Sequence, residues 1–231
     1  MKSAPLPSAA RARRRDAGAT REALLLAGTD LFAEHGYDGV PVADIAQRAG
    51  VNKAMINYHF GGKRQLYMAI VGATFDEIVG SVERLAAEPR PAPEILRELI
   101  AVVSEAVTRR HPHFCTMMLR EVLSGGSHLE PMLVAQPVRL LAAVQSIVAR
   151  GVREGDFRPV DPVLTHLSLV GGLVFFFATR TFRERVLARR QPGVKPPDTA
   201  AYVRHVQDLL TRGLAAPRPG GRRTPSRRPR P

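Results

Sequence analysis

Apolar residues recur along the chain at the three- and four-residue spacing of α-helices, and no pair of alternating segments predicts a β-sheet. Residues 20–35 show the pattern first, with Leu24, Ala27 and Leu31 on one stripe of a helix that Gly36 ends. Further helices are expected over residues 42–50, 52–61, 63–86, 94–110, 112–124, 138–154, 161–190 and 198–214. The pattern therefore predicts an all-α protein, with a small three-helix head and a larger helical bundle as its body.

Composition and charge divide the chain into four parts. Its 231 residues carry 34 Lys and Arg against 21 Asp and Glu, a net charge of +13, and much of the excess lies at the two ends. Residues 1–19 and 216–231 are rich in Arg, Pro, Gly and Ser, so we expect a disordered basic arm and a disordered basic tail. These ends either only keep the protein in solution or contact a polyanion such as DNA. Between them we expect a helix-turn-helix domain, residues 20–66, and the body, residues 67–215. Thr20 is expected to cap the first helix of the domain.

The single cysteine and the apolar segments indicate where the chain works. Cys115 cannot form an intrachain disulfide, which fits a reducing cytosol. The N-terminal sequence MKSAPLPSAARARRR lacks the apolar centre of a signal peptide, so export is not expected. The longest apolar run, residues 167–178, is too short to span a bilayer and predicts a buried helix instead. We therefore expect a cytoplasmic protein without a membrane partner.

Residues 42–61 have the pattern of a helix-turn-helix, in which the segment AGV joins two short helices. Gly50 supplies the tight turn, and the apolar residues Val51, Ile56 and Phe60 anchor the second helix in the core. The residues on the opposite face then point outward, namely Lys53, Ala54, Asn57 and Tyr58. An α-helix fits the major groove of DNA, where Asn can pair with adenine and small groups can meet a thymine methyl. This face is therefore a candidate for reading bases.

Residues at both ends of the second helix add to this surface. Asn52 is expected to cap the helix, and Lys53 can reach guanine or a phosphate. Tyr58 and His59 lie near its end, where contact with phosphate is more natural. The alternative is an ordinary packed helix pair whose polar groups only face water.

The step Gly61-Gly62-Lys63 extends the surface to the next helix. Gly61 ends the recognition helix, and Gly62 begins the following one without a side chain in the way. The exposed N–H groups of that helix can then meet a DNA phosphate, with Lys63 beside it. The candidate DNA-binding residues are therefore Asn52, Lys53, Ala54, Asn57, Tyr58, His59 and Lys63.

The segment LFAEHGYDGVPVADIAQRAGVNKAMINYHFGGKRQLY is similar to the DNA-binding head of the tetracycline-repressor (TetR) family, and the resemblance extends over residues 20–67. The family's recurrent features stand at Phe32, Gly36, Tyr37, Val42, Ile45, Ala46, Ala49, Gly50, Val51, Tyr58, Phe60, Lys63 and Leu66. The form NYHFGGK, with LREVLSGG further on, is similar to a CecR-like branch. One departure is Pro41, where the family usually has Thr or Ser. Proline suits a first helical turn, but the hydroxyl contact with phosphate is lost.

The resemblance implies what the body does. Family members usually repress transcription as homodimers on palindromic operators, so the body is expected to dimerise and to bind a small-molecule effector. The effector would shift the long helix that begins at Lys63, and the two heads would no longer fit successive major grooves. Both half-sites are read together only when the recognition helices stand about 34 Å apart. The implied partners are double-stranded DNA, a second copy of the chain and an effector, and no cofactor is implied.

An apolar stripe in the body could line the effector pocket. It consists of Phe114, Met117, Met118, Leu119, Val122 and Leu123. Among these residues Phe114, Met117 and Met118 are the effector-binding candidates, because methionine adapts to ligands of different shape. Glu121 could orient a polar group of the effector, and Arg120 is expected in a local salt bridge at the surface. Ordinary core packing explains each apolar residue equally well.

The segment 161–190 has the pattern of a helix that forms the dimer interface. The candidate interface residues are Leu167, Val170, Gly171, Val174 and Phe175. The pair Gly171-Gly172 allows the backbones of two helices to approach closely. Plain packing inside one chain remains the alternative.

The segment HPHFC, residues 111–115, raises the question of a metal site with His128. Two His and a Cys can ligate zinc, but Pro112 and this spacing match no strong zinc motif. We therefore expect no metal ion.

An enzyme is the rival class of function, for example a metal hydrolase that uses His111, His113 and Glu121. It lacks support because the sequence shows no glycine-rich phosphate loop, no paired carboxylates and no nucleophile elbow. A purely structural helical adaptor would leave the surface of residues 49–67 unexplained. The sequence thus predicts a ligand-responsive transcriptional regulator and favours a repressor.

Overall fold

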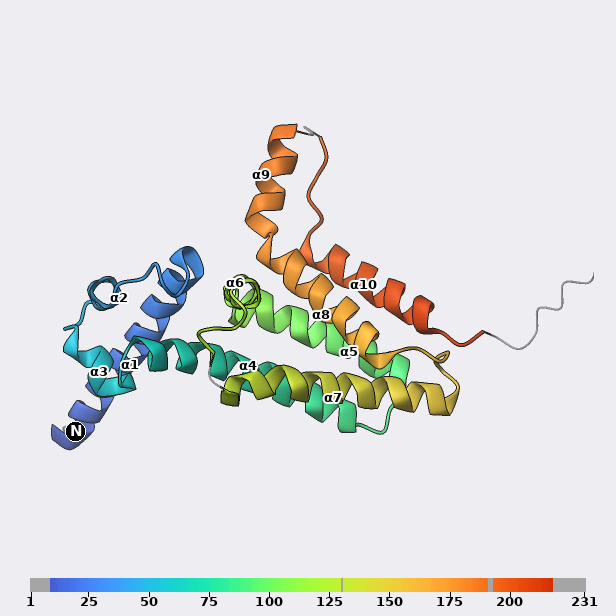
Figure 1. Cartoon of the computed structure of the whole chain (residues 1–231), viewed down its shortest axis with the longest axis horizontal. Helices are drawn as coiled ribbons and strands as arrows, with labels where there is room; N and C mark the ends of the chain where they lie inside the picture. The colour runs from blue at the N-terminus through green and yellow to red at the C-terminus, as the bar shows by residue number, and fades with distance from the viewer. Residues whose placement is uncertain (1–8, 130, 191–192, 218–231) are drawn as a thin grey trace, which may run out of the picture.

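The computed structural model describes residues 9–129, 131–190 and 193–217, and over these ranges the backbone is mostly helical. They hold ten α-helices and one π-helical turn, and their only β-structure is an isolated bridge between Phe157 and Ala215. The all-α prediction is confirmed. Figure 1 shows a small head of three helices at one end and an elongated body, joined by the long helix α4.

The head consists of α1 (Ala9–His35), α2 (Val42–Arg48) and α3 (Ala54–Phe60). Gly36 and Gly61 follow α1 and α3 with φ angles of 76° and 83°, a left-handed region that glycine enters without steric cost. The two short helices are too short to be stable alone, so the apolar residues that they bury in the centre of the head hold them. The fully buried side chains at this centre are Leu24, Phe32, Ile45, Ile56 and Leu66.

Helix α1 begins at Ala9, so the prediction that Thr20 caps this helix is wrong. The expectation of a disordered arm over residues 1–19 is also wrong for residues 9–19, which are helical. Alanine and arginine, which dominate this stretch, are strong helix formers, and a helix that is already fixed downstream can extend into solvent. Residues 1–8 of the arm and 218–231 of the tail lie outside the described residues.

The body is built around α4 (Lys63–Ala87), which leaves the head and runs along the body beside α7 (Figure 1). Its other elements are α5 (Ala92–Glu105), the π-helical turn η1 (Ala106–Arg110), α6 (Phe114–Leu123), α7 (Pro131–Glu154), α8 (Pro162–Ala178), α9 (Arg180–Arg190) and α10 (Thr199–Leu214). Helix α10 packs against α5, and α6 packs against both α1 and α8. Helix α6 therefore connects the head to the far side of the body.

Buried apolar side chains form two clusters along this axis. The first joins the centre of the head to the first half of α4 and to α6, as Ile56, Phe75 and Met118 illustrate. The second lies among the second half of α4, α5, α7, α8 and α10. The predicted boundary between residues 66 and 67 falls inside α4 and inside the first cluster. Head and body thus share one core where they meet, which allows a change in one to affect the other.

Three of the six predicted body helices agree with the structure within two residues at each end. The other three differ. The helix predicted over residues 94–110 is α5 followed by η1, and the helix predicted over residues 138–154 begins at Pro131. Pro137, just before the predicted start, lies inside α7. Because proline lacks an amide donor, it leaves one backbone hydrogen bond of this 24-residue helix unmade.

The single helix predicted over residues 161–190 is two helices, α8 and α9, which are separated at Thr179. Arg183 turns back from α9 and donates to the Phe176 carbonyl oxygen at 2.7 Å and to Thr179 Oγ1 at 3.1 Å. It therefore satisfies a carbonyl that a continuing helix would have bonded. In the described part of the chain no single helix is long and apolar enough to cross a bilayer. Helix α8 and residues 180–187 pass that test only together, as a pair bent by 61°.

Candidate DNA-binding surface and ligand cavities

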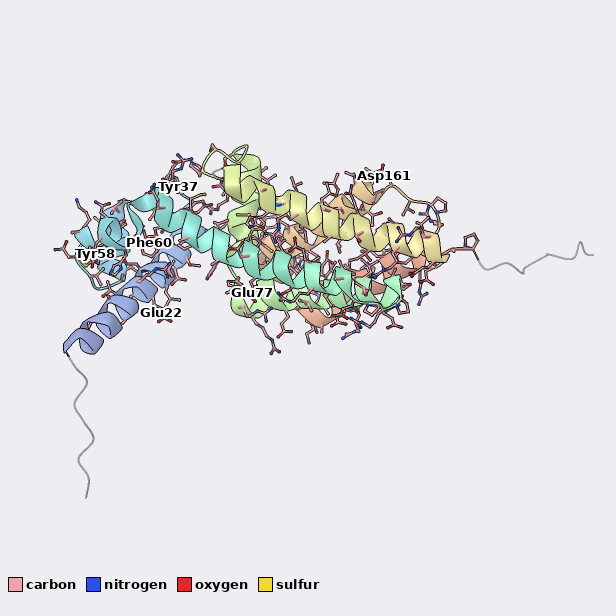
Figure 2. The ribbon with its side chains drawn as sticks, turned by 90° about the horizontal axis from the view of Figure 1, so that it is seen from below. Glu22, Tyr37, Tyr58, Phe60, Glu77 and Asp161 are labelled. Carbon is pink, nitrogen blue, oxygen red and sulfur yellow. The ribbon has the colours of Figure 1, made fainter. Side chains whose placement is uncertain are left out.

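The face of α3 that points away from the core is open to solvent. Ile56 is fully buried and fixes the opposite face of the helix. The predicted outward residues are all exposed, namely Lys53, Ala54, Asn57 and Tyr58. The exposed fraction of Tyr58 is 76%, and Figure 2 places this residue at the end of the head remote from the body. The orientation of α3 is confirmed, and its contact with DNA stays a prediction.

The turn before α3 is built as its sequence indicates. Gly50 has a φ of 67°, and Asn52 Oδ1 accepts a hydrogen bond from the Ala54 N–H at 2.8 Å. The predicted capping role of Asn52 is therefore confirmed, and its side chain is already engaged before any DNA binds. Pro41 occupies the cap position of α2, where no side chain bonds the first turn. The lack of a hydroxyl at Pro41 thus leaves this helix end without a side-chain acceptor.

Helix α4 begins beside α3 with its first turn uncapped. Gly62 precedes it with a φ of 138°, and no side-chain cap bonds its first amides. These N–H groups can donate hydrogen bonds to an anion such as phosphate. The structure places Lys63 differently from the prediction, because it is half-buried with Nζ 4.4 Å from the centre of the Tyr37 ring. Burial lowers the pKa of Lys63, partly offset by the charge of Asp38. Lys63 must leave Tyr37 to reach a phosphate.

Aromatic contacts surround the end of α3. His59 is half-buried and stands edge-on to Tyr58, with ring centres 5.0 Å apart. Arg21 of α1 lies with its guanidinium 5.1 Å above the centre of the Phe60 ring. The guanidinium adds a positive charge close to the recognition helix. Sequence reasoning did not single out Arg21, because only the packing of α1 against α3 brings it there.

Two cavities lie near the junction of head and body. The larger, of about 380 Å³, lies among α1, α4 and the segment before α6, and both Phe114 and Met117 line it. The smaller, of about 190 Å³, is lined by Met117 and Glu121 together with residues of the head. Met118 is buried but lines neither cavity. Two further members of the predicted stripe, Val122 and Leu123, are 73% and 79% exposed, so their assignment to it is wrong.

Glu121 is buried at 3% exposure and has polar neighbours from distant parts of the chain. The Tyr67 hydroxyl donates to Glu121 Oε1 at 2.8 Å, and His128 Nδ1 lies 3.0 Å from the same oxygen. His128 Nε2 lies 3.3 Å from Asp38 Oδ2 in the head. Burial raises the pKa of the Tyr67 hydroxyl, and its bond to Glu121 raises it further. Arg120 donates to the Glu34 carbonyl oxygen at 3.0 Å, where a surface salt bridge was expected.

The histidines considered for a metal site are dispersed. His111 Nε2 lies 2.7 Å from Glu77 Oε2, whereas His113 Nε2 lies 3.5 Å from Asp30 Oδ1. Neither His111 nor His113 is bonded to Glu121, so the arrangement for a hydrolase is not assembled. Within the described ranges, no group of three His, Cys, Asp or Glu side chains could hold a metal ion.

Helix α8 exposes an apolar stripe. Leu167 and Phe175 are 59% and 64% exposed, and Gly171 between them is also exposed. Val170 and Val174 are half-buried at the edge of the stripe. The expectation that residues 167–178 form a buried helix is therefore wrong on this side. A groove of about 620 Å³ separates α8 from α10, where Leu209 is 61% exposed.

Two parts of the chain each match a known family. Residues 24–70 match the bacterial regulatory proteins of the tetR family, and residues 93–210 match the tetracyclin repressor-like C-terminal domain. The protein belongs to the TetR family of transcriptional regulators. Proteins of the TetR family bind DNA, respond to ligands and typically repress transcription, and they are regulators rather than enzymes.

Relatives within the TetR family extend over most of the chain. The transcriptional repressor NicS of Pseudomonas putida is 29% identical over 213 residues, which are 87% of this chain and 95% of NicS. The transcriptional regulator RutR of Escherichia coli is 29% identical over 150 residues, which are 65% of this chain and 70% of RutR. The crystal structure of the TetR regulator PfmR from Thermus thermophilus superposes with a TM-score of 0.66 at 27% identity, covering 83% of this chain and 98% of PfmR. None of these three names indicates a CecR-like branch, so that assignment stays a prediction.

Several residues that the TetR fold brings to the smaller cavity escaped sequence reasoning. Tyr67 was only the last residue of the segment that resembles the family, Asp38 was not singled out, and His128 was considered only for a metal. Tyr67 and Glu121 are 54 residues apart in the chain. No local spacing signals such a contact. Only the packing of α6 against the head determines it.

Proposed function

We propose that the protein is a ligand-responsive transcriptional repressor that binds a palindromic operator as a homodimer and releases it when a small molecule occupies the body. The observation that supports this most is the outward face of α3 beside the uncapped start of α4. This pair of features matches the major groove and its phosphate wall. NicS, a named transcriptional repressor, favours repression over activation. Acting on DNA in a bacterial cell, the protein would work in the cytoplasm.

Asn57 and Lys63 have different tasks in this proposal. Asn57 is exposed on the outer face of α3, where its amide can present a donor and an acceptor to one base edge. Tyr58, Lys53 and Ala54 complete that face. Lys63 would leave the Tyr37 ring and bind phosphate, which carries no sequence information.

The homodimer would form through α8 and α10. The exposed stripe of Leu167, Gly171 and Phe175, with Val170 and Val174 at its edge, is an apolar surface that monomers rarely leave open. Tyr202 of α10 stacks on Phe176 of α8 at 3.5 Å, so the two helices of one chain present a joint surface to a second copy.

The effector would enter one of the cavities at the junction of head and body, where Phe114, Met117 and Glu121 line the walls. Met118 would support these residues from the core. Because the first core cluster joins the head to α6, a ligand that binds one head orientation better would move the heads.

Selection of binding sites from random DNA tests the function directly. The native protein should enrich an inverted repeat, and Asn57→Ala should flatten the preference at one position of each half-site by about 1–3 kcal/mol. Lys63→Ala should weaken all sequences equally and reduce the salt slope of binding by about one unit. If the native protein enriches no sequence, the proposed function is wrong.

Sedimentation tests the dimer. A Cβ at Gly171 would meet no atom within 4 Å of it in one chain, so Gly171→Arg should fold and yield monomers. Gly18→Arg is the matched control, because Gly18 is also helical and its Cβ position is equally open. An unaltered dimer in Gly171→Arg would exclude this interface.

A further inference from the structure

The two oxygens of the Glu121 carboxylate differ in their surroundings. Oε1 accepts the hydroxyl of Tyr67 and lies within hydrogen-bond distance of His128 Nδ1. Oε2 is buried, and no described residue donates a hydrogen bond to it. A buried carboxylate oxygen without a donor is costly, so native proteins rarely leave one unless another molecule binds there. Glu121 therefore has unused capacity for a hydrogen-bond donor.

This carboxylate lines the smaller cavity, of about 190 Å³. Aromatic rings form another wall of it: Tyr37 and Tyr67 meet edge to face with their centres 5.2 Å apart, and Phe32 stands 5.0 Å from Tyr67. Asp38 adds a second carboxylate at the rim. A carboxylate beside aromatic faces is the combination that binds organic cations, because both attract positive charge.

Basic groups also line this cavity, but their contacts leave Oε2 unpaired. Arg120 donates to the Glu34 carbonyl oxygen, and His35 lies 3.7 Å from Glu34 Oε2. His128 lies between Glu121 Oε1 and Asp38, so it turns neither nitrogen to Oε2. Lys63 Nζ lies 4.4 Å from the centre of the Tyr37 ring, but Lys63 does not line the cavity.

We propose that this cavity binds a small planar organic cation with N–H donors, such as an amidinium, through Glu121 Oε2 and the aromatic wall of Tyr37 and Tyr67. The cavity is smaller than the sites of drug-sized ligands, which favours a compact molecule. The ligand would sit between the head segment 35–39 and α6, where Arg120 and His128 connect head to body. Its effect on operator binding rests on the proposed function, whereas binding itself does not.

Three probes of nearly equal size and shape separate charge from shape. Benzamidine carries a cation with N–H donors, benzamide is neutral with N–H donors, and benzoate is an anion without them. We expect benzamidine to bind the native full-length protein more tightly than benzamide, and benzoate not to bind, as measured by NMR shift perturbation. Binding of benzoate equal to that of benzamidine, or no binding by any probe, would overturn the proposal.

Variants locate the binding. Glu121→Gln keeps the size of the side chain and an acceptor for Tyr67 but loses the charge, so the Kd for benzamidine should rise about tenfold or more. Glu77→Gln is the matched control, since Glu77 is engaged with Arg110 and His111 outside this cavity, and it should bind as the native protein does. An unchanged Kd in Glu121→Gln would refute the role of Oε2.

Two further measurements keep the proposal testable if Glu121→Gln is uninformative. If Glu121→Gln does not fold, Ser124→Trp fills the cavity from its exposed rim and should abolish benzamidine binding without touching the carboxylate. Retained binding in Ser124→Trp would place the ligand elsewhere. Operator affinity with and without benzamidine then separates the two proposals. Benzamidine bound at Glu121 without any change in operator affinity removes only the regulatory role, whereas absence of operator binding in the probe-free protein contradicts the proposed function.

Discussion

Replacing Asn52 with alanine removes the side chain that bonds the first turn of α3, where Oδ1 lies 2.8 Å from the Ala54 nitrogen. The recognition helix has only seven residues, so its few internal bonds make this cap a large part of its local stability. We expect Asn52→Ala to loosen the helix rather than to remove a base contact. Asn52→Ser should restore most of the loss, because serine is also a good cap.

The magnitude follows from this one hydrogen bond. Loss of an asparagine cap typically costs about 1 kcal/mol, which lowers Tm by about 2–4 °C for a chain of this size. If the whole loss of about 1 kcal/mol falls on α3, the affinity for DNA drops by at most about fivefold per half-site, since a tenfold change in affinity corresponds to about 1.4 kcal/mol. The drop should be the same for every DNA sequence.

Thermal unfolding by circular dichroism and binding-site selection together separate the two roles. Asn52→Ala should lower Tm and leave the selected sequence unchanged, whereas Asn57→Ala should leave Tm nearly unchanged and alter the selected sequence. The reasoning is refuted if Asn52→Ala keeps the native Tm but changes the preference at one base position. Asn52 would then read a base, and its bond to Ala54 would add nothing to stability.

Three further predictions concern the body. Gly151→Ala places a Cβ against Cδ2 of the buried Phe157 ring, so the free energy of unfolding should fall by about 1–3 kcal/mol in urea titration, and an unchanged midpoint would mean that the ring moves freely. Burial raises the pKa of the Cys115 thiol to about 12, so Ellman's reagent at pH 8 should react slowly with native protein and fast in urea, and equal rates would contradict this burial. Burial lowers the pKa of His166, so as the pH falls the unfolded chain takes up this proton before the folded protein does, and the free energy of unfolding should fall below about pH 6.5. His166→Leu should flatten this part of the stability-against-pH curve. Identical curves for the two proteins would exclude His166 as the cause of the pH dependence.

The sequence by itself determined that the chain is helical, the cap and the end of α3, and the outward face of this recognition helix. These features depend on residues a few positions apart. Gly61 ends α3 because its own backbone enters the left-handed region, and Asn52 caps α3 because its side chain reaches two residues ahead. The outward position of Asn57 follows from Ile56 being apolar beside it, since neighbours on a helix point in different directions.

The tertiary structure decided which distant residues meet. Tyr67 and His128 reach Glu121, and Asp38 reaches His128, only because α4, α6 and the turn after α1 pack together. Packing also made the segment 161–190 bend where Arg183 bonds the Phe176 carbonyl, and left Phe175 exposed on a helix predicted to be buried. Helical hydrogen bonds join residues four apart, so local sequence specifies them. The free energy of a contact across the core depends instead on how whole helices fit, which no short segment encodes.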